Sequence, residues 1–127
     1  MSDQSTITAD HIKSVFQRYV ELVTRGDFEA VAALYAEDAT VEDPVGSEPH
    51  RGRAAIRDFY AASAGKVRLE LEGRVRVAGR DGAAAMVARP TGVPGVVIET
   101  LDVMSFDDAG RITSMRAYWS PDTIYHE

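Results

Sequence analysis

The amino-acid sequence predicts an α+β fold, in which three helices cover one face of a curved sheet. In the first half of the chain, apolar residues recur at spacings of three and four, which is typical of helices with one buried side. In most of the second half, apolar and polar residues alternate, which is typical of half-buried strands. Helices followed by a run of long antiparallel strands favour a sheet whose helices lie on one side.

Composition narrows the classes of protein. The 127 residues fit one domain, 1–127, and the polar segments 1–8 and 121–127 are expected to be loose tails. There is no cysteine, which excludes disulfides, thiolate nucleophiles and cysteine-based zinc sites. A net charge of −6 argues against a nucleic-acid partner. No stretch is apolar enough to span a membrane, and we expect a cytoplasmic protein.

The first helix is expected between a cap at Thr8 and a stop at Gly26. Its inward stripe consists of Ile12, Val15, Phe16, Tyr19, Leu22 and Val23. Tyr19 lies inside this stripe, so its ring should be buried and its hydroxyl needs a hydrogen-bond partner.

A second helix, a strand and a third helix are expected next. Asp27 can cap the second helix, whose inward residues are Phe28, Val31, Leu34 and Tyr35. Residues 39–43 read as a strand with Ala39, Val41 and Asp43 on one face, ended by Pro44. After a loop over 46–52, a helix from about residue 53 carries Ile56, Phe59 and Tyr60.

Four strands are predicted in the second half, over residues 67–77, 83–89, 96–106 and 111–120, with turns at 79–82 and 107–110. The strand 96–106 places Asp102 on a mostly apolar face, with Thr100 and Met104 beside it. The last strand carries Met115, Ala117 and Trp119 on one face.

Two aspartates break the strand pattern by facing the core, and they are the candidate site. A carboxylate there is costly unless it is paired, hydrogen-bonded or protonated, and Asp43 alone would read as an ordinary Asp-Pro turn. With Asp102 and the inward tyrosines Tyr19, Tyr35 and Tyr60, it indicates a pocket for a small molecule. An ionised aspartate can take a proton from carbon, while a tyrosine and a protonated aspartic acid can donate to one oxyanion. A structural polar network fits the pattern equally well.

Cofactor and metal motifs are missing. The chain has no glycine-rich nucleotide loop, no nucleophile elbow and no H-E-x-x-H pattern. Its three histidines, His11, His50 and His126, are scattered and form no ligand cluster.

Four segments resemble the Δ5-3-ketosteroid isomerases in order and spacing: residues 18–23, 35–44, 101–104 and 117–120. The resemblance runs over about residues 12–120. It implies a cofactor-independent, metal-free steroid Δ-isomerase that moves a proton of a 3-oxo-Δ5-steroid from C4 to C6 through a dienolate. It further implies a cone-shaped, mixed sheet of the nuclear transport factor 2-like (cystatin-like) type, with the helices on its concave side, and a homodimer packed through the sheets.

The resemblance also implies roles for individual residues. Asp43 corresponds to the general base, and Tyr19 and Asp102 correspond to the two donors of the oxyanion hole, with Asp102 protonated. Supporting positions are Tyr35 and Tyr60 behind Tyr19, Trp119 beside the base, and Met86 and Met104 in the substrate pocket.

Residues 83–95 depart from the family pattern, and we expect this stretch to border the pocket and to affect substrate preference. Two alternatives stay open, because a fold by itself does not determine an activity. One is another lyase, hydrolase or cyclase of the same fold. The other is a non-catalytic dimer that binds a ligand.

Overall fold

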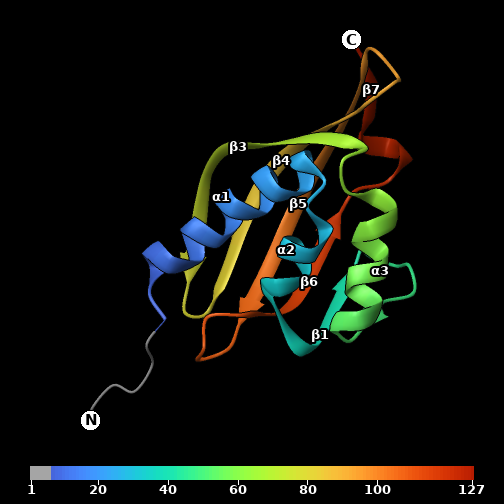
Figure 1. Cartoon of the computed structure of the whole chain (residues 1–127). Coiled ribbons are helices and arrows are strands. Elements are labelled where there is room, and N and C mark those ends of the chain that lie inside the picture. The colour runs from blue at the N-terminus through green and yellow to red at the C-terminus, as the bar shows by residue number, and fades with distance from the viewer. Residues whose placement is uncertain (1–6) are drawn as a thin grey trace.

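The computed structural model describes residues 7–127 and shows three helices on one side of a seven-stranded sheet (Figure 1). The expected tail over residues 1–6 lies outside the described residues. The helices are α1 (Ala9–Arg25), α2 (Phe28–Ala33) and α3 (Arg53–Ser63), and a short 3₁₀ helix is η1 (Pro121–Thr123). The strands are β1 (Tyr35–Glu42), β2 (His50–Arg51), β3 (Val67–Ala78), β4 (Asp81–Pro90), β5 (Val96–Phe106), β6 (Ile112–Tyr118) and β7 (Ile124–His126).

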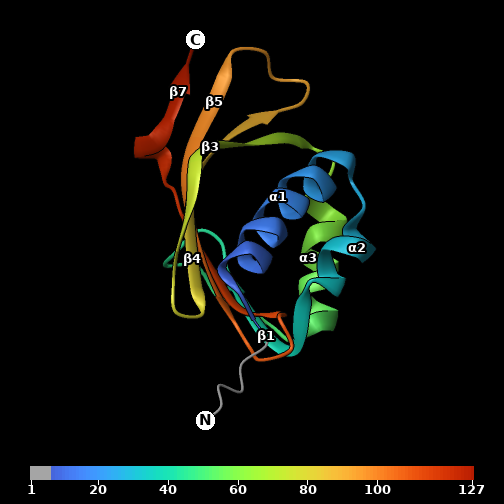
Figure 2. The ribbon, with the colours of Figure 1, turned by 90° about the vertical axis from the view of Figure 1, so that its left-hand side faces the viewer.

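The sheet is mixed, and the predicted α+β class is confirmed. Its strand order is β2-β1-β6-β5-β4-β3, and β7 pairs with the beginning of β5. The β1–β6 pair is parallel and the other pairs are antiparallel. Figure 2 shows the sheet nearly edge-on, with all three helices on the same side. The order brings the end of β1 next to the end of β6, although the two strands are far apart in the sequence.

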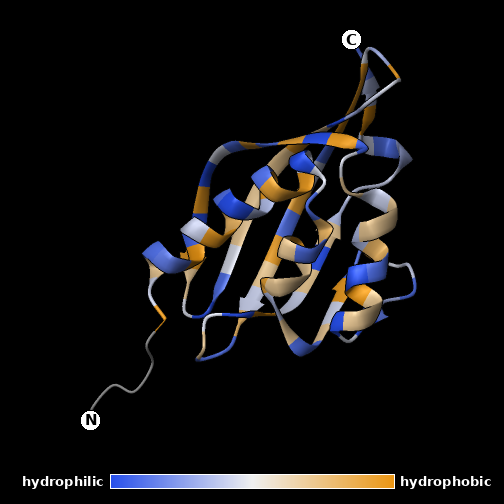
Figure 3. Ribbon diagram, viewed as in Figure 1, coloured by the Kyte–Doolittle hydropathy of each residue, from blue (hydrophilic) through white to orange (hydrophobic). Residues whose placement is uncertain are grey.

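Helix α1 forms for the local reasons that the sequence indicates. The hydroxyl of Thr8 accepts a hydrogen bond from the amide of His11, and Gly26 ends the helix at φ 82°. Residues at spacings of three and four are buried against the sheet, in the predicted stripe. Figure 3 shows the resulting alternation of apolar and polar residues along α1 and along β3.

Two glycines shape the sheet around α1. In β3, the register with β4 shifts between Glu72 and Arg76, and Gly73 there has φ 82°, so a bulge bends the strand. Gly82 belongs to β4, whereas the sequence pattern placed it in a turn. A Cβ atom at Gly82 would lie 2.7 Å from Cε1 of Phe16. The absence of a side chain at this position therefore lets α1 approach the sheet closely.

Two predictions in the first half of the chain are wrong. Tyr35 begins β1 instead of continuing α2, which ends at Ala33. Its pairing with Ile112 of β6 buries it completely, and this non-local contact outweighs the helical spacing. Residues 50–51, expected in a loop, form the short strand β2 and pair with Thr40 and Val41.

The expectation of a loose C-terminal tail is also wrong. Ser120 caps η1, and β7 then pairs with residues 96–98 of β5. Strand β5 extends past the end of β6, so its first residues would otherwise form an unpaired edge. The segment is held further by a 2.8 Å ion pair between Arg89 and Glu127.

Candidate active site

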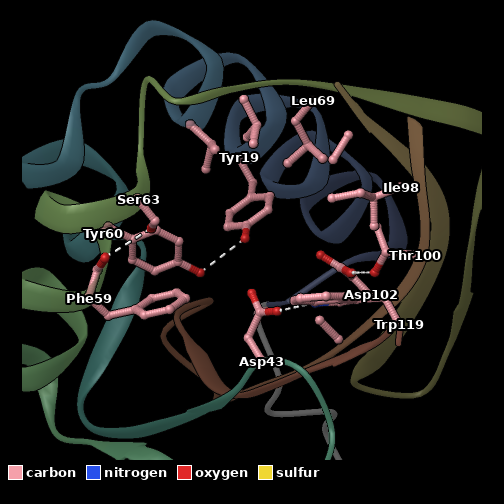
Figure 4. Close-up of a pocket in the computed structure, with 14 residues that line it drawn as sticks. Tyr19, Asp43, Phe59, Tyr60, Ser63, Leu69, Ile98, Thr100, Asp102 and Trp119 are labelled. Carbon is pink, nitrogen blue, oxygen red and sulfur yellow. Dashed lines mark hydrogen bonds between the residues drawn. The ribbon is translucent and has the colours of Figure 1, made fainter. Parts of the chain in front are cut away.

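A cavity of about 260 Å³ lies between helices α1 and α3 and the concave face of the sheet (Figure 4). Its walls are mostly apolar. The lining residues are Tyr19, Val23, Asp43, Phe59, Tyr60, Ser63, Val67, Leu69, Ala88, Ile98, Thr100, Asp102, Ala117 and Trp119. The structure therefore brings the three principal candidates, Tyr19, Asp43 and Asp102, to one apolar pocket, as the sequence pattern predicts.

Asp43 directly follows β1, and hydrogen bonds with β6 and with the residue after that strand fix its position. Within β1, Ala39 and Val41 are fully buried, so alternation turns Asp43 to the same side of the sheet. The amide of Val45 then donates a 2.8 Å hydrogen bond to the carbonyl of Ala117. The indole Nε1 of Trp119 donates a 2.7 Å hydrogen bond to Oδ1 of Asp43. The carboxyl group is thus held at the cavity wall by the neighbouring strand.

Burial raises the pKa of Asp43 above its ordinary value. The hydrogen bond from Trp119 and the nearby His50 oppose this shift, because both favour the ionised carboxylate. A carboxylate with a raised pKa is a stronger base than one in water. The indole hydrogen bond goes to Oδ1, and within residues 7–127 no hydrogen bond is made to the other oxygen, which can act on a substrate.

Three buried tyrosines form a chain of hydroxyl groups. The hydroxyl of Tyr19 lies 3.0 Å from that of Tyr60, which lies 2.8 Å from that of Tyr35. Burial raises the pKa of all three well above 10. They are therefore neutral at physiological pH and can act as hydrogen-bond donors. Tyr19 and Tyr60 line the cavity, and Tyr35 lies behind them.

Asp102 is the buried carboxyl group of β5, with 3% of its surface exposed. Burial, reinforced by the negative charge of Asp43, raises the pKa of Asp102 to about 7. A hydrogen bond of 2.9 Å from the hydroxyl of Thr100 acts in the opposite direction. Near neutral pH, a large fraction of Asp102 is therefore protonated and able to donate a hydrogen bond into the cavity.

Met86 and Met104, predicted to line the pocket, are not among the lining residues. Both are completely buried in the core of the domain. Met104 shares a face of β5 with Asp102 but pairs with Gly82 and Met115 in the neighbouring strands, where α1 covers the sheet. Of the divergent stretch 83–95, Ala88 is the residue that lines the cavity.

Several wall residues were not singled out from the sequence. Phe59 was placed on an inward helical stripe, and its ring packs 4.4 Å, centroid to centroid, from that of His50. The rest of this group is Val23, Ser63, Val67, Leu69, Ala88, Ile98, Thr100 and Ala117. Alternation alone assigns them to the inner face of the sheet or helix, but it cannot separate cavity wall from filled core.

Residues 7–127 contain no cluster of histidine and carboxylate groups that could hold a metal ion. Within the same range, none of the helices has the length and apolar character needed to cross a bilayer.

The mixed sheet, its three covering helices and the buried carboxyl groups define the class of the protein. A family model described as "SnoaL-like domain" matches residues 16–115. The chain therefore belongs to the SnoaL-like family, whose members have a nuclear transport factor 2-like fold.

Comparison with individual relatives narrows the class further than the family does. "Steroid Delta-isomerase" of Nocardioides simplex is 50% identical over 111 residues, which cover 87% of this chain and 90% of that protein. This similarity confirms the resemblance to the ketosteroid isomerases. "Epoxide hydrolase LasB" of Streptomyces lasalocidi is 32% identical over 84% of this chain and 40% of its own length. The solved structure of the epoxide hydrolase/cyclase-like enzyme SalBIII superposes with a TM-score of 0.82 at 32% identity, covering 91% of this chain and 95% of that one.

Proposed function

We propose that this protein is a steroid Δ-isomerase that moves the double bond of a 3-oxo-Δ5-steroid into conjugation with its carbonyl group. The observation that carries the proposal is one apolar cavity lined by the carboxyl groups of Asp43 and Asp102 and by the neutral hydroxyl of Tyr19. In this proposal Asp43 is the base, and Tyr19 and the protonated fraction of Asp102 are the two donors. The 50% identity to a protein named steroid Delta-isomerase supports this substrate class.

Proton transfer is assigned to Asp43. Its carboxylate removes a proton from C4 of the bound steroid, and the electron pair of the C4–H bond moves toward the C3 oxygen to give a dienolate. The protonated Asp43 then returns the proton to C6, the C4–C5 double bond forms, and the C3 carbonyl is restored. One group can serve both positions because it is first a base and then an acid.

Negative charge on the C3 oxygen is stabilised by Tyr19 and Asp102. Both groups lie in a largely apolar cavity, where a hydrogen bond to an anion is stronger than in water. Tyr19 can be polarised further through Tyr60 and Tyr35, because hydroxyl groups in a chain strengthen one another. We expect no cofactor or metal to be needed, and full activity after dialysis against a chelator would test this.

The direct test is ultraviolet absorbance, because the product is a conjugated enone and the substrate is not. Asp43→Asn should lower kcat roughly 10²–10⁴-fold, the usual contribution of a general base, while the circular dichroism spectrum stays the same. Asp38→Asn is the matched control, because Asp38 is an exposed carboxylate on β1, the strand that Asp43 follows. Normal turnover by Asp43→Asn would show that the mechanism is wrong.

We also propose a homodimer that packs through the outer face of the sheet. Leu101 and Tyr118 are 44% and 42% exposed, and they pair across β5 and β6 on the side opposite the cavity. Paired exposed apolar side chains favour association with another apolar surface. Light scattering should give twice the chain mass for the unaltered protein and one chain mass for Leu101→Glu. A monomeric unaltered protein would contradict the proposal.

Two other functions can be tested in parallel. The weaker likeness to LasB and SalBIII makes an epoxide hydrolase or cyclase the second candidate, and turnover of hydroxy-epoxides without steroid turnover would select it. A non-catalytic dimer would bind a phenol or steroid without exchanging protons with it.

The cytoplasmic location and the lack of a nucleic-acid partner stay predictions, which cell fractionation and a nucleic-acid binding assay would test.

A further inference from the structure

Thr100 is a polar residue of the cavity wall that the proposed mechanism does not use. It lies two residues before Asp102 on β5, so both side chains point to the same face of the sheet. Its hydroxyl Oγ1 donates a 2.9 Å hydrogen bond to Oδ1 of Asp102. Figure 4 shows this pair at the side of the cavity, across from Tyr19 and Asp43.

The two oxygens of the Asp102 carboxyl group have different surroundings. Among residues 7–127, the Thr100 hydroxyl is the single hydrogen-bond partner of this carboxyl group, and it contacts Oδ1. No side-chain oxygen or nitrogen that is fully buried lacks a partner in the described part of the chain. Within residues 7–127 Oδ2 has no hydrogen-bond partner, so it is open to the cavity that Asp102 lines, where the substrate would lie.

We propose that Thr100 is a positioning residue, whose hydroxyl occupies Oδ1 of Asp102 and thereby keeps the acidic proton on Oδ2, facing the substrate oxygen. This inference rests on the proposed function, in which Asp102 donates a hydrogen bond to the developing oxyanion. Asp102 is the catalytic residue, and Thr100 acts through it.

The location of the proton matters because a protonated carboxyl group has one donor and one acceptor oxygen. If the proton were on Oδ1, lone pairs of Oδ2 would face the oxyanion and repel it. The hydrogen of the Thr100 hydroxyl already lies between Oγ1 and Oδ1. A proton on Oδ1 would point at that hydrogen, so the carboxyl proton is placed on Oδ2 instead. The β-branched side chain of threonine restricts χ1, which limits the directions that the hydroxyl can take.

The same hydrogen bond has a second effect, on ionisation. A donor to Oδ1 stabilises the carboxylate, so Thr100 lowers the pKa of Asp102 against the effect of burial. The other titratable group that acts on Asp102 is Asp43, after β1, which raises its pKa. Asp102 in turn raises the pKa of the hydroxyls of Tyr19 on α1 and Tyr35 on β1, which face it. Loss of the Thr100 hydroxyl should therefore misplace the proton and also raise the pKa of Asp102.

The experiment compares Thr100→Val, which keeps the shape and removes the donor, with Thr100→Ser, which keeps the donor. Thr113→Val is the matched control, because it removes a hydroxyl from the same sheet whose bond goes to a backbone carbonyl outside the cavity. Two quantities are measured for each full-length protein. One is the pH titration of the Asp102 carboxyl carbon by NMR, assigned with Asp102→Asn. The other is kcat and KM for the steroid as a function of pH.

For Thr100→Val, the Asp102 titration should move to higher pH by roughly one unit, which is the effect of losing one hydrogen bond to a charged group. Near neutral pH, kcat should fall roughly three- to tenfold with little change in KM, because alignment and not substrate binding is lost. Thr100→Ser and Thr113→Val should behave like the unaltered protein.

An unchanged Asp102 titration in Thr100→Val, or a Thr100→Ser variant as impaired as Thr100→Val, would overturn the proposal. These outcomes are separable from a failure of the proposed function. If the unaltered protein does not isomerise the steroid, the isomerase assignment fails, while the carboxyl titration still decides whether Thr100 controls the protonation of Asp102.

Discussion

The indole nitrogen of Trp119 donates a 2.7 Å hydrogen bond to Oδ1 of Asp43, across 76 positions of sequence. The contact exists because β1 and β6 are parallel neighbours and both side chains follow the ends of their strands. It favours the ionised form of Asp43, in a site where burial favours the protonated form.

Trp119→Phe should move the acid limb of the kcat/KM profile to higher pH. The active form of Asp43 is the carboxylate, and removal of a donor to the carboxylate raises its pKa, so activity is lost first on the acid side. At high pH the variant should recover much of the normal rate. Tyr125→Phe, at an exposed aromatic residue of β7, should leave the profile unchanged. An acid limb that stays in place or moves to lower pH would contradict this prediction.

Tyr19→Phe and Tyr60→Phe should differ in their effect on kcat. Tyr19→Phe removes a direct donor to the oxyanion and should cost roughly 10²–10³-fold, the usual effect of losing one such donor. Tyr60→Phe leaves that donor in place and removes only its partner, so the loss should be smaller. Steady-state kinetics on both variants shows which one loses more kcat. A larger loss in Tyr60→Phe would exclude Tyr19 as the direct donor.

Asp102→Asn should flatten the dependence of stability on pH. The pKa of Asp102 is raised from its ordinary value of 3.8 to about 7. Between these values, the folded chain holds a proton that the unfolded chain releases. The contribution of Asp102 to the free energy of unfolding is therefore present at low pH and is lost as the pH rises toward 7.

Urea denaturation at pH 5 and pH 8 measures this effect. The unaltered protein should lose roughly 2–3 kcal/mol more than Asp102→Asn between these two pH values. Asp38→Asn, at an exposed site, should follow the unaltered protein. Equal losses in the unaltered protein and in Asp102→Asn would mean that Asp102 is ionised throughout this range.

Gly82→Ala should destabilise the fold by roughly 1–3 kcal/mol, the usual cost of adding a methyl group to a packed core. The new Cβ would lie 2.7 Å from Cε1 of Phe16 and 2.8 Å from Cγ2 of Ile12, both on α1. Thermal or urea unfolding measures the loss. The double variant Phe16→Leu/Gly82→Ala should lose less than the sum of the two single losses, because the smaller side chain makes room. Strict additivity would show that the contact with Phe16 is not the cause.

Much of the local structure could be predicted because its signals lie close together in the sequence. Helix α1 is bounded by the cap at Thr8 and by the positive φ of Gly26, as predicted. Strand β5 covers residues 96–106, as the alternation of its side chains indicates. Asp43 and Asp102 could be singled out for the same reason, since each breaks a clear pattern on its own strand. Their catalytic roles, in contrast, came from the resemblance to the ketosteroid isomerases.

The failed predictions concern contacts between distant segments. Strand β7 forms because the beginning of β5 extends beyond β6, and nothing within residues 124–126 indicates this. Met86 was expected at the pocket and lies in the core, because its distance from the cavity depends on where α1 crosses the sheet.

By itself, the sequence determined the fold class, the faces of the main helices and strands, and the two carboxyl groups that point inward. These features follow from periodicities of two and 3.6 residues and from capping residues, which act over a few positions. Only the tertiary structure decided that Trp119 holds Asp43, that Tyr60 joins Tyr19 to Tyr35, and that Thr100 occupies one oxygen of Asp102. The first two arise from strand order and helix packing, which join residues far apart in the chain. The third depends on a side-chain rotamer, which the pattern of apolar and polar residues does not encode.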